Sequence, residues 1–256
     1  MARVLVTGST DGIGLESARR LLAAGHDVVA HARDEGRAAD VRATLPGLAD
    51  VVVGDLASLA GTRRLAEQAT AAGPYDAVIH NAGVGGGAPR TETADALERI
   101  FQVNTVAPYL LTALMPRPAR LVYLTSGLEA QGKVALDDLQ WTARPWDGMQ
   151  AYSDSKLYDV VLAFAVARLW PDVLTTAVDP GWIKTKLGGS DAWDEVGPGA
   201  ATQVWLATSD DPAAHITGRY LKRFQVLAAN PAASDVAVQD ALLDRLAALT
   251  GVTLPR

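Results

Sequence analysis

Short apolar runs alternate with helix-like segments along most of the chain. The runs lie within residues 4–6, 28–30, 51–53, 77–80, 120–125 and 173–178, and their length is typical of buried strands. Between them, apolar residues recur at helical spacing, as at Leu15, Ala18, Leu21 and Leu22. Strands that alternate with helices predict βαβ units. We therefore expect an α/β fold with a doubly wound parallel sheet of about seven strands, flanked by helices.

The second half of the chain completes this pattern. Residues 91–114 predict one long helix that carries Asn104, and residues 157–170 predict another that opens directly after Tyr152 and Lys156. Helices are also expected at residues 200–207 and 235–249, with a short strand near residues 220–221. The polar, Gly- and Trp-containing residues 187–199 predict a mobile lid. Because no linker or low-complexity segment interrupts the chain, residues 1–256 are expected to form a single domain.

Composition and charge narrow the class of protein. The chain has 256 residues, 49% of them hydrophobic, a net charge of -6 and no cysteine. The sequence has no basic patch of the kind that binds nucleic acid. Without cysteine it can form no disulfide. No second His or carboxylate lies near His80 at a spacing typical of metal ligands. We also find no leader peptide and no apolar run of about 18 residues. The expectation is a cytoplasmic protein with no metal, no nucleic acid and no membrane as partner.

A glycine-rich segment separates the first predicted strand from the first predicted helix. In this context glycines let the backbone approach a pyrophosphate, and the helix N-terminus supplies N–H donors and positive potential. The spacing is Gly-x3-Gly-x-Gly, so a plain tight turn is the alternative. The candidate dinucleotide-binding residues here are Gly8, Thr10, Asp11, Gly12, Ile13 and Gly14.

The end of the second predicted strand bears on the choice of dinucleotide. An acidic residue at this place would accept hydrogen bonds from the adenosine ribose and repel a 2′-phosphate. Ala32 occupies it and Arg33 follows, and a guanidinium pairs well with phosphate. We therefore expect NADP(H) to be preferred, with NAD(H) possible. In the alternative, Arg33 is solvated and Asp34 binds the ribose or caps the next helix.

Tyr152 and Lys156 are four residues apart on a predicted helix and therefore share a face. A nearby ammonium favours the phenolate over the phenol, so the pair is suited to transfer a proton near neutral pH. Ser126 directly follows the fifth predicted strand, at the edge where ligands bind in open α/β sheets. Taken alone, the pair is also compatible with an ordinary surface pair, and Asn104 with a satisfied core amide.

In chain order, these motifs resemble those of the short-chain dehydrogenase/reductase family over nearly the whole sequence. Finer features are similar to the retinol-dehydrogenase-like branch, which mostly uses NADP: the glycine loop, Arg33, residues 136–141 and residues 249–252. The resemblance implies a Rossmann-type fold. It rests on residues 7–14, Asp55, residues 81–83, Asn104, Ser126, Tyr152, Lys156, Pro180, Gly181 and Thr185.

The resemblance also implies a role for each of four residues. Tyr152 is the general acid that protonates the developing alkoxide, and Lys156 assists it and hydrogen-bonds the nicotinamide ribose. Ser126 orients the carbonyl oxygen, and Asn104 holds a water that passes protons to Lys156. Further cofactor contacts are expected from Asp55, Leu56, Asn81, Ala82, Gly83, Tyr152, Lys156, Pro180, Gly181, Ile183 and Thr185.

The expected activity is reversible hydride transfer between NADP(H) and a carbonyl/alcohol pair on a small, apolar molecule. Two alternatives stay open: a catalytically silent dinucleotide-binding sensor, and an epimerase or dehydratase on the same scaffold. Trp141, Trp146, Trp182 and Trp193 suggest an aromatic pocket, or belong to the core. The resemblance further implies a homodimer or homotetramer.

Overall fold

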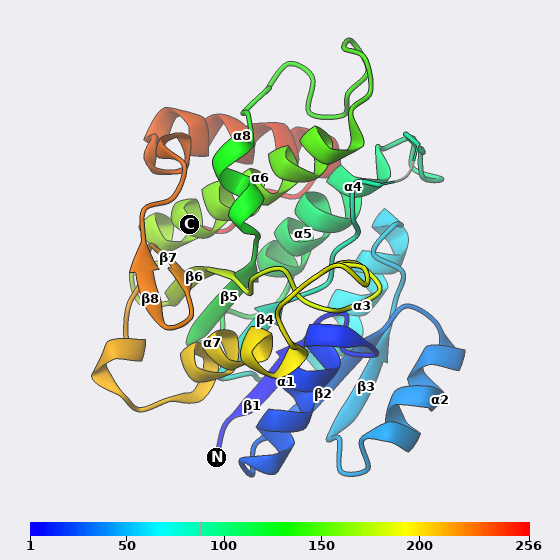
Figure 1. Ribbon diagram of the computed structural model, residues 1–256, viewed down its shortest axis with the longest axis vertical. Helices are drawn as coiled ribbons and strands as arrows, with labels where there is room; N and C mark the ends of the chain where they lie inside the picture. The colour runs from blue at the N-terminus through cyan, green and yellow to red at the C-terminus, as the bar shows by residue number, and fades with distance from the viewer. Residues whose placement is uncertain (88) are drawn as a thin grey trace.

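A computed structural model describes residues 1–87 and 89–256 (Figure 1). Its sheet has eight strands in the order β3-β2-β1-β4-β5-β6-β7-β8. The strands from β3 to β7 run parallel, and β8 runs antiparallel to β7. The bounds are β1 Arg3–Val6, β2 Asp27–Ala32, β3 Asp50–Val53, β4 Ala77–His80, β5 Arg120–Leu124, β6 Leu174–Asp179, β7 Arg219–Lys222 and β8 Gln225–Leu227.

Helices cover both faces of the sheet (Figure 1). One face packs against α3 (Leu59–Ala72), α5 (Ala107–Leu114), α6 (Gly148–Leu169) and α8 (Val236–Thr250). The other face packs against α1 (Gly12–Ala23), α2 (Glu35–Thr44) and α7 (Val196–Thr208). Short elements complete the chain: α4 (Arg99–Phe101), the π-turn η1 (Gln102–Val106), and the 3₁₀ turns η2 (Gly127–Gln131), η3 (Pro212–Ala214) and η4 (Pro231–Ser234).

The alternation of side chains along β1 explains why the central strands are continuously apolar. Leu5 belongs to the core on one face of the sheet, whereas Val4 and Val6 belong to the core on the other face. A parallel strand with helices on both sides must bury both of its faces. The predicted doubly wound α/β fold is therefore confirmed, and the sheet order reverses direction between β1 and β4.

The predicted helix over residues 91–114 is wrong in its first part. Helix begins only at Arg99, because the Glu98 carboxylate accepts hydrogen bonds from the backbone N–H of Ile100 (2.9 Å) and Phe101 (2.7 Å). This is an N-cap formed by a glutamate rather than by the usual shorter side chains. The helix then passes through the π-turn that contains Asn104 before it continues as α5.

Two other boundaries differ from the sequence expectation, and the sheet has one more strand than expected. The helix that carries Tyr152 begins earlier, at Gly148, because Asp147 accepts from the N–H groups of Met149 and Gln150. Helix α7 also begins earlier, at Val196, so the last four residues of the predicted lid are helical. The third difference is β8, which pairs with β7 through Arg223 and Phe224 at φ 49° and 66°. Such turns normally signal themselves by Asn or Gly, and here neither is present.

In the part of the chain that the structure describes, no helix has the length and apolarity to cross a lipid bilayer. The longest one, α6, carries the ionisable residues Lys156 and Asp159 within its buried length.

Candidate active site

The predicted site residues gather at one edge of the sheet, where β1, β4, β5 and β6 have their carboxyl ends. Thr7 joins the first two of these loops, because its Oγ1 accepts hydrogen bonds from the backbone N–H of Asn81 (2.9 Å) and Ala82 (3.0 Å). β1 and β4 are neighbours at the point where the strand order reverses. In open α/β sheets this point forms the ligand-binding crevice.

The glycine loop is built as a close-packed turn at the start of α1. Asn81 Nδ2 donates to the carbonyl oxygens of Thr7 (2.8 Å) and Gly8 (3.2 Å). A Cβ on Gly14 would overlap both the Gly8 oxygen and Asn81 Nδ2, so only glycine fits there. Asp11 caps α1 by accepting from the Gly12 N–H at 2.8 Å. The first-turn N–H groups of α1 therefore lie directly behind the loop, as a phosphate cradle requires.

His31 also supports this loop, although no sequence motif pointed to it. It lies near the end of β2, and its ring is buried. Nδ1 accepts from the Gly8 N–H at 2.9 Å, and Nε2 lies 2.8 Å from the Gly54 carbonyl oxygen. Burial lowers the pKa of His31. The ring is therefore neutral, with its proton on Nε2, and it ties the glycine loop to the end of β3.

The end of β2 carries no acidic side chain toward the glycine loop. Arg33 is 70% exposed and pairs with Asp34 at 3.2 Å. The other Asp34 oxygen accepts from the Arg37 N–H (2.8 Å), so Asp34 caps α2, as the alternative interpretation had it. Arg37 Nη2 lies 3.6 Å from Asp11 Oδ2. Lys186 also hydrogen-bonds Asp11 and lowers the pKa of its carboxyl.

Tyr152 and Lys156 lie one helical turn apart on α6, as predicted. The Lys156 Nζ atom is 5.9 Å from the centre of the Tyr152 ring. Lys156 is 4% exposed, and its Nζ donates to the Leu124 carbonyl oxygen (2.9 Å) and to Asp159 Oδ2 (2.8 Å). Tyr152 is half-buried, so it is more accessible to solvent than the buried Lys156.

Two opposing effects act on the Lys156 ammonium. Burial lowers the pKa of Lys156, but the negative charge of Asp159, with that of the Tyr152 phenolate, outweighs burial and raises it. Asp159 is itself buried, which raises the pKa of its carboxyl to about 6 against the pull of Lys156. Near neutral pH the pair is therefore an ammonium beside a carboxylate.

Ser126 and Asn104 complete the predicted tetrad. Ser126 follows β5 and is half-buried, and its Oγ accepts from the Leu128 N–H at 3.3 Å. Asn104 Oδ1 accepts from the Val84 N–H (2.8 Å), while Nδ2 donates to the Val84 carbonyl (3.1 Å) and to Ser155 Oγ (3.0 Å). Asn104 thus fastens the loop after β4 to the helix that carries Lys156. Its position in a π-turn is typical of functional sites.

The remaining predicted cofactor residues lie in the segments that follow β1, β3, β4 and β6. Asp55 is exposed and accepts from the Ala57 N–H (2.9 Å), whereas the Leu56 and Ile183 side chains are buried. Gly83 lies beside Lys156, and Thr185 lies so near Gly12 that a Cβ there would be 3.0 Å from Thr185 Cγ2. Pro180 and Gly181 form a turn closed by the Gly181 N–H on Asp179 Oδ1 (2.8 Å). Thr10 and Ile13 are half-buried in the glycine loop.

Two pairs of tryptophans lie on the loops around this edge. Trp141 and Trp146 stack edge-to-face at 5.8 Å and pack with Tyr152 and Ala151. Trp182 and Trp193 form a second pair at 4.6 Å and are exposed. The second pair lies on the predicted lid segment and its approach, where the Lys184 N–H donates to the Asp194 carbonyl at 2.9 Å. The first pair supports the aromatic-pocket interpretation, because Trp141 belongs to the hydrophobic cluster against which Tyr152 packs.

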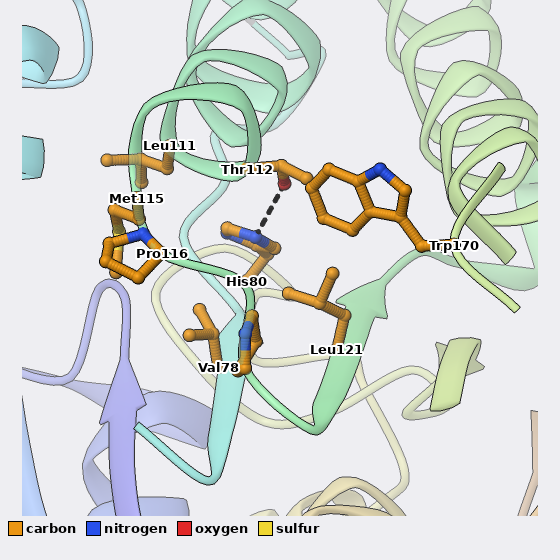
Figure 2. Close-up of a pocket in the computed structure, with 9 residues that line it drawn as sticks. Val78, His80, Leu111, Thr112, Met115, Pro116, Leu121 and Trp170 are labelled. Atoms are coloured by element: carbon orange, nitrogen blue, oxygen red, sulfur yellow. Dashed lines mark hydrogen bonds between the residues drawn. The ribbon is translucent and has the colours of Figure 1, made fainter. Parts of the chain in front are cut away.

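A separate small pocket lies between the ends of α5 and α6 (Figure 2). Its volume is about 10 Å³, at the lower limit for a single water. Trp170, on its wall, is about 27 Å along the helix from Tyr152 at 1.5 Å per residue. This pocket therefore belongs to the helix packing and not to the candidate active site. Its walls are formed by Val78, His80, Leu111, Thr112, Met115, Pro116, Pro118, Leu121 and Trp170.

Comparisons with known proteins agree with this arrangement. Residues 2–195 match the family model described as short chain dehydrogenase. Short-chain dehydrogenase chyC of Penicillium rubens is 40% identical over the full length of both chains. The provisionally named daunorubicin C-13 ketoreductase DnrU of a Streptomyces strain is 32% identical over 98% of this chain and 93% of its own. Human retinol dehydrogenase 13 is 31% identical over 98% of this chain and 85% of its own.

Solved structures extend the comparison to three dimensions. A protein from Mycobacterium paratuberculosis superposes with a TM-score of 0.87 at 26% identity, over 100% of this chain and 96% of its own. A blue fluorescent protein from a metagenomic library, solved in complex with NADPH, has a TM-score of 0.67 at 25% identity, over 86% and 94%.

Proposed function

Because this chain belongs to the short-chain dehydrogenase family, within its retinol-dehydrogenase-like branch, we propose that it interconverts a ketone or aldehyde and the corresponding alcohol with NADP(H). The observation that carries the proposal is the buried Lys156 ammonium beside the half-buried Tyr152 phenol, at the edge that also holds Ser126 and the glycine loop. The sensor alternative gives no reason for this arrangement, because binding a dinucleotide does not require a proton donor at the sheet edge.

The residues present fit a nicotinamide dinucleotide. The turn around Gly8 and Gly14 excludes any Cβ, which leaves backbone N–H groups and the α1 N-terminus available to a pyrophosphate. When bound, the dinucleotide supplies or accepts the hydride. Lys156 has three N–H donors, two of which are used within the protein, and the third is available to the nicotinamide ribose.

Tyr152 is the residue that moves a proton. In reduction its hydroxyl donates to the oxygen of the developing alkoxide, and in oxidation the phenolate takes the proton back. Lys156 places a positive charge 5.9 Å from the centre of the Tyr152 ring. Ser126 Oγ orients the same substrate oxygen, an oxyanion-type contribution. Asn104 holds the loop at Val84 and the helix at Ser155 in the positions that this geometry needs.

Two guanidinium groups support NADP(H) over NAD(H). Arg33 is exposed directly after β2, and Arg37 lies on the first turn of α2 near the glycine loop. A 2′-phosphate would pair with these groups in competition with Asp34 and Asp11, whose ion pairs with them are weak because they are solvent-exposed. The NADPH bound to the blue fluorescent protein supports the same assignment.

A parallel titration with NADPH and NADH, followed by cofactor fluorescence, tests the proposal. Loss of a charge-assisted pair costs about tenfold or more in affinity, so Arg33→Ala should weaken NADPH binding by that factor and leave NADH binding unchanged. Arg42→Ala is the matched control, because Arg42 lies on the last turn of α2 and donates to the Val51 carbonyl oxygen. If both variants have the same affinity for NADPH, the NADP assignment is overturned. If the wild-type protein binds neither NADPH nor NADH, the oxidoreductase assignment is overturned.

We propose an apolar carbonyl compound as the substrate class. Trp141 belongs to the hydrophobic cluster against which Trp146 and Tyr152 both pack, and the relative DnrU bears the name of a ketoreductase. A screen of aliphatic, aromatic and polycyclic ketones with NADPH tests this class. Turnover restricted to charged or sugar-like carbonyls would contradict it.

A further inference from the structure

Asp159 lies directly behind the proposed catalytic pair. It is one turn beyond Lys156 on α6 and is 3% exposed. Oδ2 accepts from Lys156 Nζ at 2.8 Å, and among the described residues Oδ1 has no hydrogen-bond partner. A buried carboxylate oxygen without a protein partner is costly and calls for an explanation.

Few other titratable groups face this pair. Tyr152, on the same helix, raises the pKa of Lys156, and the charge of Asp159 raises the pKa of Tyr123 on β5. The Tyr123 ring packs on His80 of β4 at 4.7 Å. Figure 2 shows His80 bonded to Thr112, and burial lowers the pKa of His80 to about 3. His80 and Tyr123 are therefore neutral near pH 7, and Asp159 is the anion that balances Lys156.

We propose that Asp159 is a positioning residue that holds the Lys156 ammonium and sets the pH at which Tyr152 gains and loses its proton. Two of the three Lys156 donors are fixed by Asp159 and the Leu124 carbonyl. This directs the third donor and limits how strongly Lys156 stabilises a phenolate at Tyr152. The part of Asp159 in catalysis rests on the proposed function, whereas its electrostatic effect on Lys156 and Tyr152 does not.

The direct test is a spectroscopic titration of Tyr152 in the free protein. Phenolate formation is followed by ultraviolet difference absorbance near 295 nm, and the Tyr152→Phe variant identifies the Tyr152 transition. The other five tyrosines ionise later, because burial raises the pKa of Tyr75, Tyr109, Tyr123, Tyr158 and Tyr220. No substrate is needed, so the result is independent of whether the oxidoreductase assignment holds.

Asp159→Asn removes the balancing charge and keeps the shape of the side chain. While Lys156 keeps its proton, the Tyr152 transition should then move about one pH unit lower, since the unbalanced ammonium favours the phenolate more strongly. Asp159→Glu keeps the carboxylate and should leave the transition near its wild-type position. If the enzyme turns over alcohols, the lower limb of the oxidation pH profile should shift with the same sign and size.

Asp154→Asn is the matched control. Asp154 is another buried carboxylate on α6, but its partners are Arg144 (3.0 Å) and the Lys133 N–H (2.8 Å). It should leave the Tyr152 transition unchanged. The proposal is overturned if Asp159→Asn leaves the transition in place, or if the Asp154 variant moves it equally. Should the Asn variant not fold, Asp159→Ser removes the same charge and must give the same downward shift.

Discussion

The backbone N–H of Gly8 donates a hydrogen bond to Nδ1 of His31, 2.9 Å away and 23 residues later in the chain. A protonated ring would present N–H at this position instead of a lone pair, and the bond would be lost. The shape of the glycine loop is therefore linked to the protonation state of one buried histidine.

This linkage predicts acid-sensitive dinucleotide binding. Burial lowers the pKa of His31, so the unfolded chain takes up the proton first as the pH falls. The stabilisation is complete above the unfolded value of about 6.5 and is lost progressively below it. The folded protein takes up this proton only at a lower pH, so NADPH affinity should stay constant from pH 8 to about 6.5 and fall only at more acid pH, where His31 is protonated in the folded loop.

His31→Gln should flatten this pH dependence, because an amide does not titrate. His26→Gln is the control, since His26 is another histidine whose pKa burial lowers but which bonds the Ala2 N–H far from the loop. Equal pH dependence in the wild type and the His31 variant would show that a different group controls binding.

Gly14→Ala should abolish dinucleotide binding. Its Cβ would overlap the Gly8 carbonyl and Asn81 Nδ2, and overpacking of this kind costs about 1–3 kcal/mol in addition to the lost loop geometry. Gly87→Ala, whose Cβ would meet no atom within 4 Å, should bind normally. Thermal unfolding and NADPH titration of both variants check the prediction, and a Gly14 variant with wild-type affinity would refute the phosphate cradle.

Asn104→Ala should loosen the loop after β4. The variant loses three hydrogen bonds, two to Val84 and one to Ser155, at a net cost of about 1 kcal/mol each. Hydrogen exchange should increase at Val84 and in the neighbouring loop more than in β4. Thr208→Ala, which removes one helix-internal bond on α7, is the comparison. Unchanged exchange at Val84 would mean that other contacts hold this loop.

The fold, and the place of the candidate catalytic residues in it, could be predicted from the sequence because both depend on local patterns. Strands such as β1 are buried on two faces and form continuous apolar runs, and the site motifs directly follow strand ends. The helix start at Arg99 depends on a Glu98 cap that resembles no standard signal. The β7–β8 turn is formed by Arg223 and Phe224, whereas glycine or asparagine at these positions would have predicted a turn.

Contacts between distant segments of the chain could not be predicted from the sequence. The bond from Gly8 to His31 and that from Thr7 to Asn81 exist only once β1, β2 and β4 are neighbours. Asp159, by contrast, lies three residues after Lys156 on the same predicted helix, and this spacing was a usable signal. NADP preference, movement of the lid and assembly into a homo-oligomer stay predictions.

The most direct test of the account compares wild-type protein with Tyr152→Phe, measuring both NADPH affinity and turnover of an apolar ketone. The phenylalanine keeps the ring beside Lys156 and removes only the proton donor. We expect turnover to fall by about 10²–10⁴-fold, while NADPH binds within about twofold of the wild type. A Tyr152→Phe variant that retains wild-type turnover would contradict the proton-transfer role on which the proposed function depends.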